Sequence, residues 1–136
     1  GLADLAEKAG PAGMAKAVAT LQRTQRQYEG IFPGIDVLLT PVCPKVPWPL
    51  GGFGPEADNP MAAVMRSAAL VTYASPFNIS GQPAISLPVA VTDGLPIGAQ
   101  LVGRWGRDDQ LLALGAQLED RLGWQHRRPP THVADL

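Results

Sequence analysis

The dipeptide Asp93-Gly94 constrains the fold of this chain more than any other local feature. It lies between two apolar segments, 84–91 and 95–102, each long enough to form a strand. Aspartate and glycine tolerate the positive backbone angles of a type I′ turn, which joins antiparallel strands with the correct twist. We therefore expect a β-hairpin in the C-terminal half of the chain.

Prolines within the two segments restrict how the hairpin can pair. Pro96 falls opposite Val91 at a non-hydrogen-bonded position, which suits a residue without an amide hydrogen. Pro88 falls at a hydrogen-bonded position opposite Ala99, where the missing donor interrupts the ladder. We therefore expect the ladder to end or to bulge near Pro88.

Helical periodicity comes before the hairpin. Residues 11–29 predict an amphipathic helix with one buried face, and the Gly-Pro pair at Gly10 predicts a break before it. A second helix is expected to begin at Pro60, which follows a capping asparagine, and to end before Pro76. The apolar stripes are Met14, Ala17, Val18, Leu21 and Tyr28 in the first helix and Met61, Val64, Met65, Ala68 and Thr72 in the second.

A further helix is expected after the hairpin, from Asp108 or Asp109 to a stop at Gly123. The acidic pair is explained by helix capping and the helix dipole. The apolar stripe comprises Leu111, Leu114, Gly115, Leu118 and Leu122.

Residues 35–40 are almost continuously apolar and predict a short buried strand stopped by Pro41. The following residues up to Pro60 are rich in proline and glycine, so they predict an irregular loop. The predicted class is α/β, with helices packed on a small mixed sheet. Along the chain, residues 1–30 are helical, 36–60 are strand plus loop, 61–122 are helix, hairpin and helix, and 123–136 are a tail.

Composition excludes several classes of function. With 136 residues the chain is the size of one domain, and its net charge of -1 gives no basic surface for nucleic acid. No apolar run approaches the length of a membrane span. The single cysteine, Cys43, is compatible with a reducing cytoplasm. No cluster of ligands has metal-binding spacing, so neither a metal nor a cofactor is predicted.

Four motifs follow one another in the second half of the chain. Residues 77–83 read Phe-Asn-Ile-Ser-Gly-Gln-Pro, 86–88 read Ser-Leu-Pro, 94–98 read Gly-Leu-Pro-Ile-Gly and 100–103 read Gln-Leu-Val-Gly. This series resembles the C-terminal part of the amidase signature family. The resemblance implies that residues 1–136 are the C-terminal segment of a larger α/β/α fold with a mixed sheet.

Enzymes of that family carry their Ser, cis-Ser and Lys catalytic residues in an upstream Gly/Ser-rich region, and no Gly-Gly-Ser-Ser-Gly stretch is present in this sequence. The resemblance therefore implies hydrolysis of a small-molecule amide through a serine acyl-enzyme, with no catalytic residue in this chain and no activity without the missing N-terminal catalytic portion. A general amidase is favoured over the amidase-family component of a glutamyl-tRNA amidotransferase. The substrate-binding residues that the resemblance implies are Ala74, Ser75, Phe77 and Asn78, with Thr40 and Pro41 as weaker candidates.

Catalysis by other residues is disfavoured on chemical grounds. Ser80 and Ser86 lack a Gly-x-Ser-x-Gly context, so local backbone partners explain them better. A pair formed by Cys43 with His126 or His132 is conceivable, but both histidines fall in the predicted tail. Lys8 and Lys16 lie on predicted solvent faces, Lys45 lies in the loop, and Gly51 to Gly54 lack the context of a phosphate loop.

An alternative from another class is a noncatalytic interaction module. An isolated hairpin and its helices leave a sheet edge and an apolar face that another chain or a second copy can cover. A reading frame that continues upstream into a Gly/Ser-rich segment would favour the amidase interpretation over this alternative.

Overall fold

The computed structural model describes residues 2–49 and 60–129. Its helices are α1 (Leu2–Glu29), α2 (Pro60–Leu70), α3 (Ser75–Ser80), α4 (Asp108–Leu122) and the 3-10 helix η1 (Trp124–His126). Its strands are β1 (Val37–Pro41), β2 (Ala84–Thr92) and β3 (Leu95–Gly103). The glycine-rich part of the predicted loop, the capping Asn59 and His132 lie outside the described residues.

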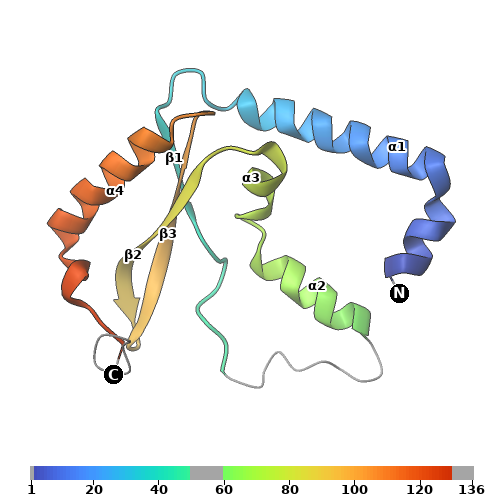
Figure 1. Ribbon diagram of the computed structural model, residues 1–136. Coiled ribbons are helices and arrows are strands. Elements are labelled where there is room, and N and C mark those ends of the chain that lie inside the picture. Colours follow the sequence, from blue (N-terminus) through green and yellow to red (C-terminus); the bar gives the residue numbers. More distant parts are fainter. Residues whose placement is uncertain (1, 50–59, 130–136) are drawn as a thin grey trace, which may run out of the picture.

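The three strands form one sheet in the order β1-β3-β2, with β3 in the centre (Figure 1). β1 pairs with β3, so that Thr40 lies opposite Gln100. The predicted α/β class with helices on a small sheet is confirmed. A mixed sheet was expected, whereas the pairings among the described strands are antiparallel. The long connection from β1 to the hairpin permits either direction, so the sequence does not determine it.

The hairpin turn is as predicted. Asp93 and Gly94 have φ angles of 51° and 76°, as a type I′ turn requires. Val91 lies opposite Pro96, which confirms the expected pairing at that position.

The predicted irregularity near Pro88 is a β-bulge. The register shifts between Pro88 and Ala90, and Pro88 lies opposite Gly98 rather than opposite Ala99 as expected. The bulge places one extra residue in β2. It accommodates a proline that has no amide hydrogen to donate, and β2 stays paired on both sides of the bulge.

Each face of the sheet carries an apolar cluster. On one face α4 and η1 cover β2 and β3, and on the other face the end of α1 and α3 pack against the sheet (Figure 1). The buried members are Leu87, Leu101, Leu111 and Trp124 on the first face and Phe32, Phe77 and Val102 on the second. Trp124 comes from the segment predicted as a tail, so the packed part of the chain extends as far as η1.

α1 is interrupted where the sequence predicts a break. Gly10 has a φ of 62°, which is not helical, and Pro11 follows it. The far end of α1 packs on α3 through Tyr28 and Phe77, whose ring centroids lie 5.6 Å apart in an edge arrangement. The rest of α1 extends away from the sheet (Figure 1).

The segment between α2 and the hairpin differs from the prediction. α2 ends at Leu70, a turn follows, and a separate helix, α3, begins at Ser75. Pro76 occupies the first turn of α3, where its missing amide hydrogen costs no helical hydrogen bond. Gly81, with a φ of 75°, ends α3 and turns the chain towards β2. Within the described residues, no helix combines the length and apolar character needed to cross a membrane.

Candidate functional site

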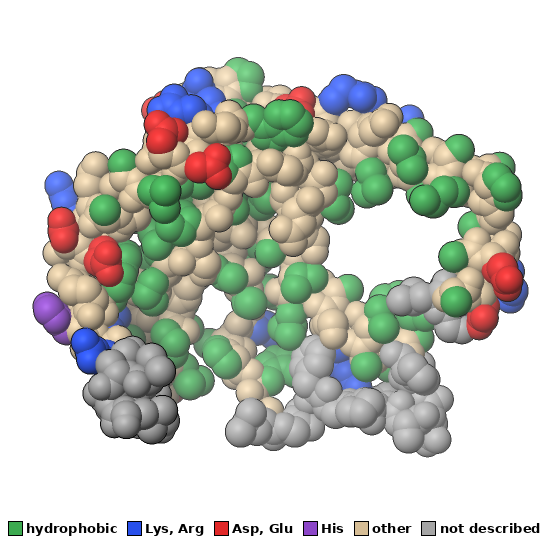
Figure 2. All heavy atoms as spheres, in the orientation of Figure 1, with side chains coloured by type: hydrophobic (Ala, Val, Ile, Leu, Met, Phe, Trp, Pro, Cys, Tyr) green, Lys and Arg blue, Asp and Glu red, His purple; other side chains and the backbone are tan. Residues whose placement is uncertain are grey.

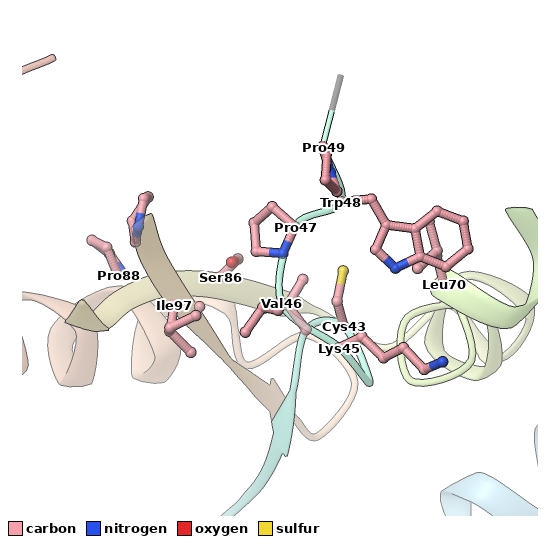
Figure 3. Close-up of a pocket in the computed structure, with 13 residues that line it drawn as sticks. Cys43, Lys45, Val46, Pro47, Trp48, Pro49, Leu70, Ser86, Pro88 and Ile97 are labelled. Carbon is pink, nitrogen blue, oxygen red and sulfur yellow. The ribbon is translucent and has the colours of Figure 1, made fainter. Parts of the chain in front are cut away.

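A hollow of about 650 Å³ lies beside the hairpin, where the chain leaves β1 (Figure 3). One wall is formed by residues between Val42 and Pro49, and Leu70 at the end of α2 contributes to the hollow as well. Pro88 and the β3 residues around Gly98 form the wall on the hairpin side. The volume is within the range of small-molecule binding sites.

The hollow is mostly apolar, with a few polar groups. Cys43, Lys45 and Ser86 supply a thiol, an amine and a hydroxyl. Figure 3 shows Ser86 on the hairpin side and the Lys45 side chain extending towards α2. Among the described residues that line the hollow there is neither a histidine nor a carboxylate to activate a serine. This composition suits binding of an apolar group better than proton transfer.

Close backbone packing fixes the wall that follows β1. The amide of Val42 donates to the carbonyl of Gly98 at 3.4 Å. Gly98 has no Cβ, and the side chain of Val42 lies over the resulting gap. The wall therefore begins in direct contact with β3.

Gln100 connects the end of β1 to the turn that follows α2. Its side chain is buried, with 6% of the residue exposed. The amide nitrogen Nε2 donates to Thr40 Oγ1 at 3.1 Å and to the carbonyl oxygen of Tyr73 at 3.0 Å. Thr40 lies just before the wall that starts at Val42, and Tyr73 lies just after Leu70.

The residues proposed from the resemblance to contact substrate lie in and just before α3. Ala74 and Ser75 are half-buried and Asn78 is exposed. Phe77 is buried in the cluster against α1, where it packs on Tyr28. None of these four residues lines the hollow beside Val42. Their contact with substrate remains a prediction.

Ser80 has the local partners that the structural explanation requires. It is 1% exposed, and its hydroxyl hydrogen-bonds Gln82 Oε1. The carbonyl of Ser80 accepts a hydrogen bond of 3.1 Å from the indole of Trp105. These bonds tie the end of α3 to the segment after β3.

Cys43 and His126 are not brought together. Cys43 is exposed at the hollow, whereas His126 belongs to η1, beyond the α4 face of the sheet. Within residues 2–49 and 60–129, no three side chains of histidine, cysteine, aspartate or glutamate gather as metal ligands would.

A smaller hollow of about 430 Å³ lies between Phe32 and Trp105 and includes Arg104. The guanidinium of Arg104 donates to the carbonyl of Ile35 at 3.1 and 2.9 Å and lies 4.0 Å from the Asp36 carboxylate. Arg104 therefore holds the entry to β1.

The acidic pair at the start of α4 lies apart from both hollows. Arg107 donates to Asp109 at 3.1 Å, and this hydrogen bond lowers the pKa of the Asp109 carboxyl. Asp109 thus pairs with the residue before the helix, which accounts for it without acid–base catalysis.

Comparison with known proteins identifies the family. The family model described as Amidase matches residues 4–112, and the chain belongs to this family. The resemblance to the amidase signature enzymes is thereby confirmed.

Two curated relatives illustrate the range of the family. The 6-aminohexanoate-cyclic-dimer hydrolase of Paenarthrobacter ureafaciens is 40% identical over 113 residues, which cover 79% of this chain and 22% of the relative. A glutamyl-tRNA(Gln) amidotransferase component from Clostridium botulinum (strain Eklund 17B / Type B) is 32% identical over 114 residues, which cover 84% of this chain and 22% of the relative.

A solved structure of a 6-aminohexanoate cyclic dimer hydrolase superimposes with a TM-score of 0.76 at 34% identity, over 92% of this chain and 27% of that one. The chain thus spans about a fifth of the length of these curated relatives.

Sequence reasoning missed most of the hollow and the hydrogen bonds by which Gln100 joins β1 to the turn after α2. The signal for the wall was limited to a proline-rich segment after an apolar strand. The partners of Gln100 are 60 and 27 residues away along the chain, so no local pattern shows them.

Proposed function

We propose that this chain is the C-terminal portion of an amidase that hydrolyses a carboxamide C–N bond through a serine acyl-enzyme. The chain binds the acyl part of the substrate, and the catalytic serines and lysine belong to the N-terminal portion. The observation that carries the proposal is the apolar hollow at the end of β1 in a chain of the amidase family.

The N-terminal portion supplies the reacting groups, and this chain supplies the site for the acyl group. An activated serine attacks the carbonyl carbon, the C–N bond breaks, and the amine or ammonia leaves with a proton. Water then hydrolyses the resulting ester to a carboxylic acid and regenerates the serine. An apolar site that holds the acyl chain positions the carbonyl for this attack. Binding of the acyl chain thereby increases the reaction rate.

Two segments of this chain are proposed to contact the substrate. Residues from Val42 to Pro49 and Leu70 hold the apolar part of the acyl group. Outside the hollow, the residues in and just before α3 that are proposed as further substrate contacts are Ala74, Ser75, Phe77 and Asn78. A small-molecule amide is favoured over a tRNA-linked substrate, because the relative named as a cyclic-dimer hydrolase is 40% identical and the amidotransferase relative 32%.

A chimeric enzyme tests the proposal. The region of the Paenarthrobacter ureafaciens hydrolase that matches this chain is replaced by all 136 residues. Release of amine or ammonia is measured on the cyclic dimer and on a panel of simple amides. The chimera is expected to hydrolyse at least one amide, whereas the hydrolase lacking the region and the chain alone hydrolyse none. A chimera that folds with a cooperative thermal transition and hydrolyses no amide in the panel contradicts the proposal.

The alternative function is a noncatalytic module that pairs with another chain or with itself. The observation that favours it is an exposed apolar stripe on α1, with Met14, Val18 and Leu21 at 66%, 42% and 48% exposure. Figure 2 shows apolar side chains gathered along the side of α1 that faces the opening below it. A stable, monodisperse dimer of the chain, together with an inactive chimera, would favour this function.

A further inference from the structure

The two sides of the hollow come from distant parts of the chain, and one side chain bonds to a residue next to each of them. The wall from Val42 to Pro49 follows β1, and Leu70 belongs to α2. The chain between them includes residues outside the described ranges. The side-chain amide of Gln100 donates one hydrogen bond to the end of β1 and one to the turn after α2.

The orientation of the Gln100 amide is set by its partners. The carbonyl oxygen of Tyr73 can only accept, so the Nε2 group must face it. The second hydrogen of the same group is directed to Thr40 Oγ1, whose own hydroxyl donates to the carbonyl of Pro41 at 3.1 Å. Both donors of Nε2 are thus used, one towards β1 just before the wall and one towards the turn after α2.

The hydrogen bonds of the turn around Tyr73 use other carbonyls, and the Tyr73 carbonyl accepts from Gln100. The carbonyl of Val71 accepts from the amides of Ala74 and Ser75, at 3.1 and 2.9 Å, and the carbonyl of Ala74 accepts from the amides at the start of α3. The hydrogen bonds of the turn therefore fix its shape, and the bond from Gln100 fixes its position against the sheet. Since Gln100 is 6% exposed, water competes poorly for these bonds.

We infer that Gln100 is a positioning residue of the substrate site, which holds the Val42–Pro49 wall and the end of α2 at a fixed separation and thereby limits the size of the acyl group that enters. The inference rests on the proposed function for its substrate. The positional part depends only on the hydrogen bonds from Gln100 to Thr40 and Tyr73.

A buried glutamine outside the site provides a matched control. Gln82 is 7% exposed, close to the 6% of Gln100, and its side chain bonds to Ser80, two residues away. Gln82→Leu and Gln100→Leu remove the same chemical group from a buried position. Only the second removes the connection between β1 and the turn after α2.

The position of the wall can be measured without activity, because Cys43 is the only cysteine of the chain and lines the hollow. In the chimera, the reaction rate of this thiol with an aromatic disulfide reagent is measured, and the same chimera with Cys43→Ser gives the background. Gln100→Leu is expected to change the rate by about tenfold, since each of the two lost hydrogen bonds shifts an equilibrium roughly two- to twelvefold. Gln82→Leu is expected to leave the rate unchanged.

The kinetic readout concerns substrate size. Gln100→Leu is expected to flatten the dependence of kcat/KM on acyl length, through KM, while kcat for the smallest amide stays within about twofold. Gln100→Glu keeps the shape but places an acceptor against the carbonyl of Tyr73, so it is expected to behave like Gln100→Leu. Thr40→Val removes one of the two bonds and serves where the leucine variant does not fold, with a smaller effect in the same direction expected.

The inference is overturned if Gln100→Leu and Gln82→Leu change the Cys43 rate equally. If the chimera is inactive but the two glutamines still differ in the thiol assay, the positional role stands and the proposed function fails. If the chimera is active and Gln100→Glu keeps the wild-type thiol rate and acyl-length profile, the positional role fails alone.

Discussion

Val42 lies in direct contact with Gly98 where the chain leaves β1. The amide of Val42 donates to the carbonyl of Gly98 at 3.4 Å. A Cβ on residue 98 would lie 2.9 Å from Val42 Cγ2 and 3.2 Å from Ser86 Oγ. Glycine at this position therefore allows Val42, the first residue of the wall, to lie against β3.

Gly98→Ala is expected to displace the wall. Overpacking of this kind costs about 1 to 3 kcal/mol, and we expect a loss in that range together with a higher KM for amides in the chimera. Urea unfolding and steady-state kinetics measure the two effects. Gly115→Ala is the control, since its Cβ would meet Ile85 Cδ1 at 3.4 Å within a helix that favours alanine. An equal loss of stability in both variants would contradict the explanation.

The contact between Tyr28 and Phe77 anchors α1 on the rest of the fold. Aromatic pairs in an edge arrangement contribute about 0.5 to 1.5 kcal/mol beyond the area they bury. A double-mutant cycle with Tyr28→Leu and Phe77→Leu is expected to give a coupling free energy in that range, measured by urea unfolding. A coupling near zero would mean that the rings stabilise the protein independently and would contradict this account of how α1 is anchored.

Gly94→Ala tests the turn that joins β2 and β3. No atom lies within 4 Å of the position that its Cβ would take, so the cost comes from the backbone alone, at a φ of 76°. We expect a loss of about 1 to 2 kcal/mol in the free energy of unfolding. Asp93→Asn, at a φ of 51°, is expected to be neutral because asparagine also tolerates this conformation. A neutral Gly94→Ala would rule out this account of the turn.

The exposed stripe on α1 predicts that the isolated chain associates. Leu21 is 48% exposed and shares the stripe with Met14 and Val18. Leu21→Glu is expected to shift the chain towards monomer in sedimentation velocity, because a charge there opposes burial of the stripe. Gln22→Glu adds the same charge at the next position, and it is expected to have little effect. Association that responds equally to both changes would indicate general charge repulsion.

Short sequence patterns were sufficient to predict the features that depend only on neighbouring residues. The Asp-Gly turn, the break at Gly10 and the glycine stop at Gly123 all depend on neighbouring residues, and all three are present. The irregularity at Pro88 was expected for the same reason, since a proline cannot donate to the ladder.

Features that depend on distant residues were not predicted. The antiparallel pairing of β1 with β3 joins segments about 60 residues apart, and neither strand shows its partner in sequence. α3 was missed although Pro76 is typical of a helix start, because only a short helix follows it. Phe77 was expected at the substrate, and its burial against Tyr28 depends on how α1 packs.

Leu101 and Val102 are neighbours in β3, and their side chains belong to the clusters on opposite faces of the sheet. Removing or adding one residue in this strand would exchange the two faces and place Gln100 on the α4 side. In an evolving family, the length of β3 is therefore expected to stay constant while loops gain and lose residues. Under the proposed function, substrate preference then changes by substitution along the wall after Val42, while the strand that supports the wall stays the same.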